Sequence, residues 1–466
     1  MTLTTWLSLM TELGLGACLA DDMGLGKSCQ VITLILALLK RGDRGPHLLV
    51  VPPSLITNWL QELEKWARGF DAAVVHGREE EPEVPRVLTI TSYDTLIRRP
   101  ALQGRDWGLV VLDEAQTIKN PETRASKAVK ALKSRMRVVL TGTPMENDLS
   151  DLWSIMDFLN PGYLADLNAF RAWFKSLPDG PERLTVIREK IRPFILRRLK
   201  TDPDVAPDLP SKIVMRVYCG LTATQAILYG QAYEACKVEL RSADGSARYA
   251  LALSAWTHLK QVCNHPANYS KSGNFDPDLS GKFARLTQIA GEIAERGEKA
   301  LIFTQFQEIT APLAAHLAGV FGRPGLVLDG KVPVKRRQAL VAQFQAEDGP
   351  PFVVMTYKVG GTGLNLTAAS HVILFDRWYN PAVENQAIDR AHRIGQTKGV
   401  VVHKFITRGT LEDTIDAKLE MKRGVAAGVI PTDEGDALGM GRLSPEELMS
   451  LAALDPMRVG QEEVEG

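Results

Sequence analysis

The sequence contains little cysteine, no long apolar segment and no excess of either charge. Its 466 residues include five cysteines and no pair with CxxC spacing, which excludes a disulfide scaffold and argues against a zinc site. The longest apolar run, Val31 to Leu39, has about half the length that a bilayer-spanning helix needs. No cationic stretch followed by an apolar one marks a secretory signal. We therefore expect a cytoplasmic chain with reduced thiols and no membrane partner.

Charge is balanced over the whole chain but distributed unevenly along it. The 55 basic and 55 acidic side chains give a formal net charge of zero, which by itself argues against binding to nucleic acid. Basic residues are nevertheless concentrated in Lys119–Arg137, Arg188–Lys200 and Lys331–Arg337, whereas acids gather in Glu79–Glu83 and after Arg423. This distribution fits a basic cleft with an acidic exterior. Solvated helix faces are the alternative explanation.

Short apolar runs typical of buried parallel strands recur between amphipathic segments such as Leu55–Ala67 and Val334–Gln345. Because strand and helix alternate, each half of the chain predicts a doubly wound parallel sheet of the α/β class. Two sets of runs predict two such lobes. The predicted strands are Ala17–Ala20, Leu48–Val51, Val87–Ile90, Leu109–Leu112 and Val138–Leu140, then Ala300–Phe303, Gly325–Leu328, Phe352–Met355, Val372–Phe375 and Val400–Phe405.

The segment between the two sets, residues 148–280, has a mostly helical pattern interrupted by turn signals such as Asn160–Gly162. From Gly424 the chain is rich in glycine and acid, and we expect it to be loose as far as Pro445–Leu454. These features divide the chain into a first lobe, residues 1–205, a second lobe, residues 206–423, and an acidic, partly flexible extension, residues 424–466.

The stretch LADDMGLGKS, Leu19 to Ser28, ends like a phosphate-binding loop but has Asp21 where the long form of the loop needs its first glycine. A strand precedes it and a helix is expected from Lys27 to about Lys40. Glycines let N–H groups turn toward phosphates, and the helix N terminus adds its dipole. Lys27 is expected to bind the phosphates of ATP and Ser28 the Mg²⁺ ion. The predicted nucleotide-binding residues here are Asp22, Met23, Gly24, Leu25, Gly26, Lys27 and Ser28.

An acid pair, Asp113 and Glu114, directly follows the apolar run Gly108–Leu112. An acid at the carboxyl end of a strand can supply a second Mg²⁺ contact, and the neighbouring glutamate can polarise the attacking water. A surface acid pair after a strand is common in isolation. Beside a phosphate loop in a doubly wound sheet, the catalytic interpretation is favoured.

The segment NPAVENQAIDRAHRIGQ, residues 380–396, predicts a helix with Asn380 as its cap and Pro381 in its first turn. An arginine finger supplied from the second lobe would make hydrolysis depend on closure of the lobes. An ion pair between Asp389 and Arg393 is the structural alternative. Three polar residues with i, i+4, i+7 spacing are expected to share one face and to act in catalysis: Gln386, Arg390 and Arg393.

Eleven motifs, in the same order, resemble those of the SWI/SNF-type DNA-translocating ATPases of helicase superfamily two, particularly the compact bacterial and archaeal members. They extend from Leu13 to about Lys422. The resemblance implies two RecA-like lobes that bind ATP and double-stranded DNA across their cleft, with helical protrusions near 148–200 and 222–280. It implies a motor that follows duplex DNA without separating its strands. Among these motifs are LGLGACLADDMGLGKS, LLVVPPSLITNW, VVLDEAQTIKN, LTGTPMEN, IRPFILRRLKTD, LKQVCNHP and GGTGLNLTAASHVILFDRWYNPAVENQAIDRAHRIGQ.

The resemblance also assigns roles to single residues. Lys27, Ser28 and Asp113 would hold phosphate and Mg²⁺, and Glu114 would activate water. Gly361 and Gly363 would approach phosphate oxygens closely, because a glycine has no side chain, and they complete the predicted nucleotide-binding set. The residues expected to contact the DNA backbone, or to couple it to the ATP site, are Pro52, Ser54, Ser92, Tyr93, Thr141, Gly142, Gln305, Gly330, Thr362 and Asn365.

Two features depart from the family pattern. Gln116 occupies a position where many relatives have histidine; an amide can still form a hydrogen bond there, so we expect activity to survive. The family has a segment upstream of the position of Trp6 that contacts adenine, and this sequence begins without it. We therefore expect weak base selectivity, with GTP or CTP used nearly as well as ATP.

The leading hypothesis is a monomeric, nucleoid-associated ATPase that moves along double-stranded DNA and remodels or displaces DNA-bound proteins. A strand-separating helicase of the same superfamily is the second hypothesis, and a non-catalytic DNA-binding module is the third. Substitution of Lys27 by alanine separates the third from the others, because only a catalytic protein would lose ATP hydrolysis.

Overall fold

The computed structural model describes residues 3–22, 24–43, 45–77, 86–142, 149–177, 181–198, 200, 202, 204–205, 208–360, 364–426, 443–459 and 464–465. The chain divides into two compact units, of which the first comprises Met1–Pro207 and the second begins at Asp208. Within the described residues, no helix combines the length and the apolar character needed to cross a bilayer.

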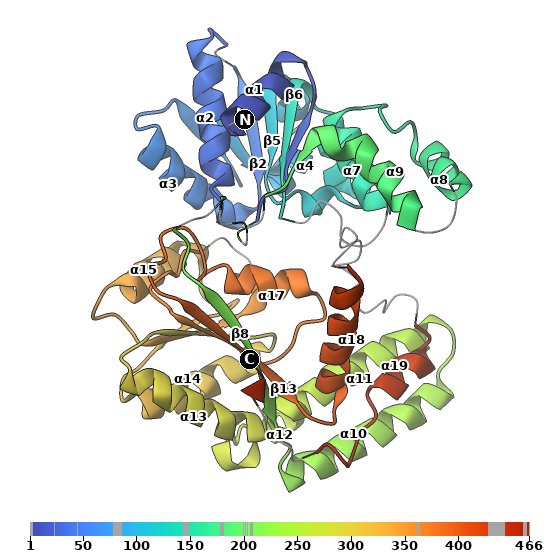
Figure 1. Ribbon diagram of the computed structural model, residues 1–466, viewed down its shortest axis with the longest axis vertical. Coiled ribbons are helices and arrows are strands. Elements are labelled where there is room, and N and C mark those ends of the chain that lie inside the picture. The colour runs from blue at the N-terminus through green and yellow to red at the C-terminus, as the bar shows by residue number, and fades with distance from the viewer. Residues whose placement is uncertain are drawn as a thin grey trace. The chain divides into compact units, whose positions relative to one another are not determined.

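The first unit is built on a seven-stranded, fully parallel sheet with the order β3-β4-β2-β5-β6-β1-β7 (Figure 1). Its strands are β1 (Ala17–Leu19), β2 (His47–Val51), β3 (Ala72–Val75), β4 (Leu88–Ser92), β5 (Asp106–Leu112), β6 (Lys133–Leu140) and β7 (Ile195–Leu196). Its α-helices are α1 (Leu3–Glu12), α2 (Lys27–Lys40), α3 (Ile56–Trp66), α4 (Tyr93–Arg98), α5 (Pro100–Gly104), α6 (Arg124–Lys130), α7 (Leu149–Leu159), α8 (Leu167–Ser176) and α9 (Pro181–Ile191). Short 3₁₀ turns are η1 (Pro53–Leu55), η2 (Ala115–Ile118) and η3 (Arg192–Phe194).

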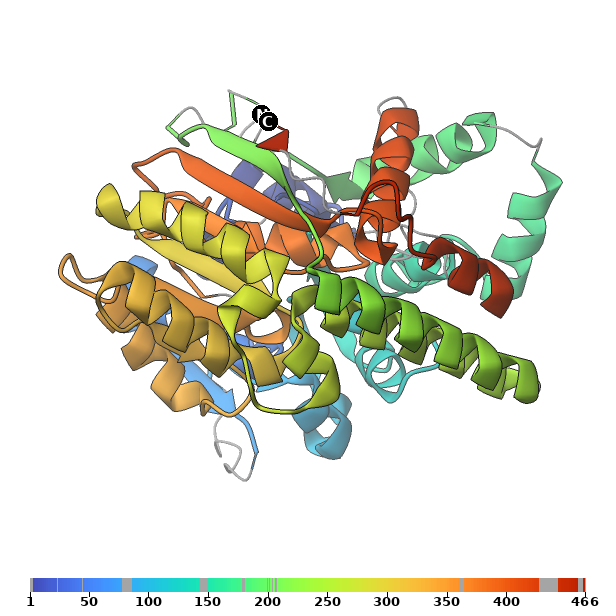
Figure 2. The same cartoon turned by 90° about the horizontal axis from the view of Figure 1, so that it is seen from below.

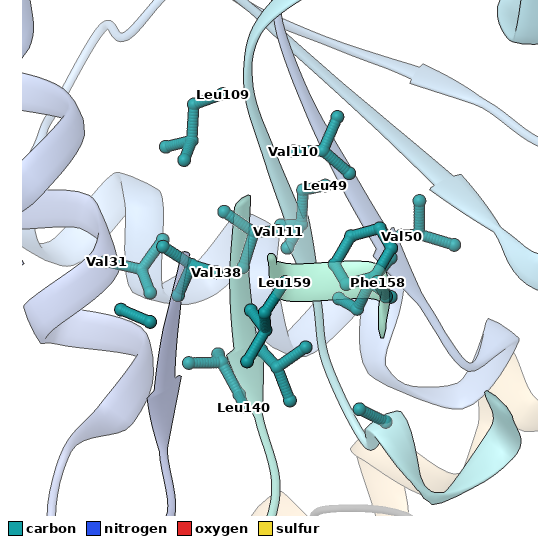
Figure 3. Close-up of a cluster of buried hydrophobic side chains, with 14 of the residues drawn as sticks. Val31, Leu49, Val50, Leu109, Val110, Val111, Val138, Leu140, Phe158 and Leu159 are labelled. Atoms are coloured by element: carbon teal, nitrogen blue, oxygen red, sulfur yellow. The ribbon is translucent and has the colours of Figure 1, made fainter. Parts of the chain in front are cut away.

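Helices cover both faces of this sheet. Crossovers between parallel strands are right-handed. A helix whose crossover leads toward one edge of the sheet therefore lies on one face, and a helix whose crossover leads toward the other edge lies on the opposite face. Accordingly α2 and α3 lie on one side and α4 on the other (Figure 1). The strands between them are buried on both faces and form the core, in which Val31 of α2, Val50 of β2, Val111 of β5 and Phe158 of α7 lie together (Figure 3).

The second unit repeats this plan with the strand order β10-β11-β9-β12-β13-β8-β14, in which only β14 is antiparallel. Its strands are β8 (Lys212–Cys219), β9 (Ala300–Thr304), β10 (Leu326–Leu328), β11 (Phe352–Thr356), β12 (His371–Leu374), β13 (Val400–Thr407) and β14 (Val464–Glu465). Its α-helices are α10 (Ala223–Ser242), α11 (Ser246–Asn264), α12 (Pro266–Ser270), α13 (Gly281–Glu295), α14 (Thr310–Phe321), α15 (Val334–Gln345), α16 (Tyr357–Gly360), α17 (Pro381–Ile388), α18 (Leu411–Ala426) and α19 (Pro445–Leu451), and η4 (Pro277–Leu279) and η5 (Gln307–Ile309) are 3₁₀ turns.

A helical layer with its own apolar core adjoins the second sheet. The helices α10 and α11 pack against α18 and α19 in this layer (Figures 1 and 2). Tyr229 donates its hydroxyl to the carbonyl oxygen of Ala452 at 2.9 Å, and Trp256 donates its indole N–H to that of Leu448 at 2.8 Å. The described C-terminal segment, residues 443–459, is therefore part of the second unit.

The predicted α/β class with two parallel-sheet lobes is confirmed. Every apolar run that was predicted to be a strand overlaps a strand of the structure. Residues 148–280 are mostly helical as expected, and Lys212–Cys219 within them forms β8, a strand that the sequence pattern did not reveal. Only the last three residues of β8 are buried, and Lys212 and Arg216 interrupt its apolar residues. A partly exposed strand of this kind lacks the continuous apolar run by which the other strands were predicted.

Candidate functional site

The candidate phosphate loop joins β1 to α2 at the carboxyl edge of the first sheet. Gly24 and Gly26 have φ angles of 85° and 75°, in the left-handed region that glycine adopts at little cost. Gly26 is the N-cap of α2, and because glycine has no side chain it leaves the first-turn N–H groups without a side-chain cap. The positive end of the α2 dipole therefore faces a loop that offers N–H donors to an anion.

Lys27 is held within this loop by main-chain oxygens. Its Nζ donates to the carbonyl oxygen of Asp21 at 2.5 Å and to that of Asp22 at 3.3 Å. Hydrogen bonds between two charged groups are stronger than those to a neutral carbonyl, so a phosphate oxygen can replace these acceptors. Ser28 follows and is partly exposed, with its hydroxyl at the start of α2.

The two acids of the loop hold the segment that follows α9. Asp21 is fully buried, and its carboxylate accepts the Arg198 main-chain N–H at 2.9 Å and the Arg198 Nη2 at 2.7 Å. The Asp22 carboxylate accepts the Lys200 main-chain N–H at 3.0 Å. Asp21, at the position where the long form of the loop has glycine, therefore has a structural role: its hydrogen bonds attach the chain after β7 to the end of β1.

The acid pair lies at the same sheet edge, because β5 is parallel to β1 and both strands end there. Asp113 accepts the indole N–H of Trp59 on Oδ2 at 2.8 Å and the main-chain N–H of Glu114 on Oδ1 at 2.9 Å. Burial and the nearby Glu114 carboxylate raise the pKa of Asp113 to about 7. The Trp59 hydrogen bond and the Lys27 charge lower this pKa but do not outweigh the two effects that raise it. The Lys27 ammonium is therefore within electrostatic range of this carboxylate.

Glu114 has a strained backbone and a fixed side chain. Its φ of 50° lies in the left-handed region, which is uncommon for a residue other than glycine and is concentrated at functional sites. The Gln116 side-chain amide donates from Nε2 to Glu114 Oε2 at 2.7 Å. Gln116, the departure from the family's histidine, thereby orients the candidate general base.

These first-unit residues fit a magnesium–triphosphate group. An uncapped helix N terminus and the Lys27 ammonium suit phosphate oxygens. The Ser28 hydroxyl and the Asp113 carboxylate are oxygen ligands of the kind that Mg²⁺ prefers. Glu114 is a carboxylate beside this set and can accept a proton from water.

Two first-unit residues predicted to contact DNA are buried. Ser92 caps α4 by accepting the Thr95 N–H at 3.3 Å, and its hydroxyl lies 3.1 Å from His76 Nδ1. Tyr93 donates its hydroxyl to the main-chain oxygen of Asp113 at 2.8 Å. Both side chains have intramolecular partners, so their burial argues against direct side-chain contact with a duplex.

The remaining predicted DNA-contact residues of the first unit differ in exposure. Pro52 and Ser54 are partly exposed around η1. Thr141 is buried, and its N–H extends the pairing of β6 with β1 by donating to Leu19 O at 3.1 Å. Gly142, the next residue, is partly exposed.

In the second unit, α17 begins as predicted and ends earlier. Asn380 caps it by accepting the Ala382 N–H at 2.8 Å, and Pro381 is its first residue. The helix ends at Ile388, where tighter bonds such as Arg390 N–H to Ala387 O at 3.2 Å follow. The prediction of one regular helix face through residue 393 was therefore wrong.

The three predicted catalytic residues of this segment are placed differently. Gln386 lies within α17 and is partly exposed. Arg390 is buried, and its Nε donates to the main-chain oxygen of Gln386 at 3.0 Å. Arg393 lies in the following turn and is partly exposed.

A buried ion cluster that the sequence did not reveal holds the first turn of α17. Arg377, which follows β12 after Phe375 and Asp376, donates to Glu384 of α17 at 2.8 and 3.2 Å and also pairs with Asp416 of α18. Lys404 of β13 lies 3.5 Å from Glu384. Although burial opposes its charge, Arg377 and Lys404 lower the pKa of Glu384 to about 2. In the sequence, the charged residues Asp376 and Arg377 directly follow the apolar run Val372–Phe375, and this was the signal that could have revealed the cluster.

A second buried network ties the helical layer to the sheet. Lys282 Nζ donates to Asn264 Oδ1 at 2.9 Å and to Glu412 Oε1 at 2.8 Å. Asn264 donates in turn to Asp376 Oδ2 at 2.9 Å. Asp376 also accepts the main-chain N–H of Gln305 at 2.9 Å, so this network fixes the end of β9 where Gln305 lies.

Two predicted DNA contacts of the second unit, Gln305 and Gly330, follow the carboxyl ends of β9 and β10. Gln305 is half-buried, and its side-chain nitrogen has no hydrogen-bond partner among the residues that the structure describes. Gly330 and Asn365 are exposed. Four predicted site residues lie outside the described residues: Met23, Gly361, Thr362 and Gly363.

Comparison with known proteins adds two family matches. A model of the SNF2-related domain matches residues 2–268, and a model of the helicase conserved C-terminal domain matches residues 281–395. The chain is 40% identical over 464 residues to the putative ATP-dependent helicase/translocase YwqA of Bacillus subtilis, covering 96% of this chain and 50% of that protein. It is 32% identical to human SWI/SNF-related matrix-associated actin-dependent regulator of chromatin subfamily A member 1, over 96% of this chain and 44% of that protein.

Further matches extend to other organisms. The rice DNA repair and recombination protein RAD54 is 33% identical over 95% of this chain and 52% of its own length. Among solved structures, the Sulfolobus solfataricus SWI2/SNF2 ATPase core in complex with dsDNA is 39% identical, covers 97% of this chain and 96% of its own, and has a TM-score of 0.46. The chain spans about half the length of the curated relatives it matches.

Proposed function

Because the chain belongs to the SNF2-related family, we propose that it hydrolyses ATP to move along double-stranded DNA and to displace or remodel proteins bound there. The observation that carries the proposal is the gathering of Lys27, Ser28, Asp113 and Glu114 at one edge of one sheet. Gln116 orients Glu114 beside them.

The chain's own groups divide the work of hydrolysis. The magnesium–triphosphate group supplies the anhydride bond and the charge that these residues recognise. Lys27 would exchange the carbonyl oxygens of Asp21 and Asp22 for phosphate oxygens, and Ser28 and Asp113 would hold the ion. Glu114 accepts the proton of the attacking water. Gln386, Arg390 and Arg393 remain predicted transition-state contacts, which single alanine substitutions would test.

Support for DNA as the partner comes from the relatives. The names of RAD54 and YwqA point to DNA repair and to a helicase or translocase. The basic run from Lys119 to Arg137, with Arg124 and Lys133 exposed, offers charge for phosphates. We propose that the protein contacts mainly the backbone of the duplex and works as a monomer.

ATP hydrolysis measured without nucleic acid and with single-stranded DNA, duplex DNA or RNA tests the proposal. We expect duplex DNA to stimulate hydrolysis most and Lys27→Ala to abolish it. Equal rates in all four conditions would exclude a DNA motor. Activity that persists in Lys27→Ala would exclude this site.

Displacement assays separate translocation from strand separation. A translocase removes the third strand of a triplex and leaves the underlying duplex paired. A helicase releases one strand of a forked duplex. We expect ATP-dependent triplex displacement and no release from the fork; the opposite result would favour the helicase.

A further inference from the structure

Two aromatic residues of the first unit, Trp59 and Tyr93, each donate one hydrogen bond to Asp113. Trp59 lies one turn into α3, just beyond the η1 turn, and donates to the carboxylate at 2.8 Å. Tyr93, the first residue of α4, donates to the main-chain oxygen at 2.8 Å. Both aromatic side chains are buried, so the contacts are shielded from water.

These contacts determine how the Asp113 carboxylate is oriented. The Trp59 indole occupies one lone pair of Oδ2, and the Glu114 N–H occupies one lone pair of Oδ1. Each carboxylate oxygen has a second lone pair, which remains for a metal ion or its water. With both oxygens bonded, the carboxylate plane cannot rotate without breaking a hydrogen bond. Partners of this kind, which hold a metal ligand in place, typically affect metal affinity strongly.

The Trp59 donor is rigidly connected to the partly exposed η1 turn. The N–H of Leu55 donates to Pro52 O at 2.9 Å, and α3 continues from η1 without a break, with Ile56 and Leu63 buried on either side of Trp59. Tyr93 follows the cap residue of α4 directly. A displacement of the η1 turn therefore moves the Trp59 donor at Asp113, whereas Tyr93 holds the Asp113 main chain from a buried position.

We propose that Trp59 and Tyr93 are positioning residues for metal binding by Asp113, and that Trp59 links this binding to engagement of duplex DNA by the η1 turn. The inference rests on the proposed function. When the η1 turn is seated on a DNA backbone, the Trp59 indole is fixed and the carboxylate keeps its metal-binding orientation. Because linkage is reciprocal, duplex DNA tightens metal binding and bound metal–nucleotide tightens duplex binding.

The test measures metal affinity directly. Mn²⁺ is titrated into the full chain with ADP, with and without duplex DNA, and the free ion is followed by electron paramagnetic resonance. In the wild-type protein we expect duplex DNA to tighten Mn²⁺ binding about fivefold or more. In Trp59→Phe, which removes the indole N–H, we expect Mn²⁺ binding about tenfold weaker and no effect of DNA.

Trp107→Phe is the matched control. Trp107 is buried in the same unit and donates its indole N–H to the main-chain oxygen of Leu102 at 3.0 Å, away from the acid pair. It should keep the wild-type Mn²⁺ affinity and the effect of DNA. Equal losses in Trp107→Phe and Trp59→Phe would reduce Trp59 to a packing residue and overturn the inference.

Tyr93→Phe provides a second, milder variant that removes one hydroxyl and keeps the ring. We expect it to weaken the DNA effect, and we expect less than additive loss when it is combined with Trp59→Phe, because both act on Asp113. Full DNA-dependent tightening in both single variants would refute the inference while leaving the proposed function intact. A wild-type protein that neither binds duplex DNA nor hydrolyses ATP faster with it would refute the proposed function itself.

Discussion

Glu114 combines a left-handed backbone with a side chain fixed by Gln116. Strain of about 1–3 kcal/mol at such a position persists only where the surrounding structure over-determines it. Here the main-chain N–H of Glu114 donates to the Asp113 carboxylate, and the Gln116 side-chain amide donates to the Glu114 carboxylate. The geometry of the proposed base is therefore maintained by two hydrogen bonds.

Substitution of Glu114 by glutamine should leave nucleotide binding and remove turnover. The amide is close in size but cannot accept the proton of water, and positioned general bases contribute about 10²–10⁴-fold. We expect a loss of that order in kcat, with fluorescent ADP bound as in the wild type. A variant that keeps more than about half of the wild-type rate would show that Glu114 is not the base.

Gln116→Ala should lower kcat about tenfold through loss of orientation, with the KM for ATP nearly unchanged. Gln116→His should restore most of the rate, because an imidazole N–H can donate to the same carboxylate oxygen. Steady-state kinetics with saturating duplex DNA measures both. If the KM rises while kcat stays constant, Gln116 acts on binding instead.

At the scale of elements, β7 and the phosphate loop depend on each other through Arg198. Arg198→Ala would remove the guanidinium that pairs with the buried Asp21 carboxylate and leave it the main-chain N–H of residue 198 and the Gln30 amide. Breaking a buried pair costs about 3–5 kcal/mol, and we expect the lower end because the Arg198 side chain is 29% exposed. Urea unfolding of the wild type, Arg198→Ala and Arg198→Lys measures this; the lysine variant should lose less. An unchanged midpoint in Arg198→Ala would contradict the role of the pair.

The position of α17 depends on the charge of Glu384. Its folded-state pKa of about 2 lies below the unfolded value, so its stabilisation is complete above pH 5 and is lost as the pH falls from about 4.5 toward 2. We expect Glu384→Gln to be less stable than the wild type at neutral pH by a few kcal/mol, on the order of 3. The difference in melting temperature should shrink below pH 4.5. Glu295→Gln, an exposed control on α13, should show no such trend.

Elements that bury apolar side chains on both faces could be predicted from the sequence. The runs that became β2 and β9 are continuous and apolar, and α2 begins at Lys27 and ends at Lys40 as predicted, because glycines precede it and no breaker interrupts it. The strands β3, β7, β8 and β14 were missed. Both β7 and β14 have only two residues, and β3 and β8 are partly exposed.

Partners distant in sequence could not be predicted. Motifs identified Asp113 and Lys27 as candidate site residues, whereas Trp59 lies 54 positions before Asp113 and Arg198 lies 177 positions after Asp21. Only the strand order brings these pairs together. Similarly, the prediction that Gln386 and Arg393 share one helix face assumed a regular helix, whereas α17 ends at Ile388.

For the whole molecule, binding to duplex DNA should depend steeply on salt although the net charge is zero. Contacts with the DNA backbone release counterions in proportion to the number of phosphates neutralised. With four or more such contacts, affinity should fall at least about a hundredfold between 50 and 200 mM salt. Fluorescence anisotropy with two duplexes of unrelated sequence measures this, and both should give the same slope. A strong preference for one sequence would instead indicate base contacts.

The attachment of Arg198 and Lys200 to Asp21 and Asp22 has a mechanical consequence. The covalent path toward the second unit leaves from these two basic residues, so tension along it is applied first to the wall of the phosphate loop. The Lys27 ammonium donates hydrogen bonds to the main-chain carbonyl oxygens of the same two residues, Asp21 and Asp22. A motor stalled against an obstacle would therefore release its nucleotide at a rate that varies with the load, and an optical-trap measurement of stalled dwell times would detect this.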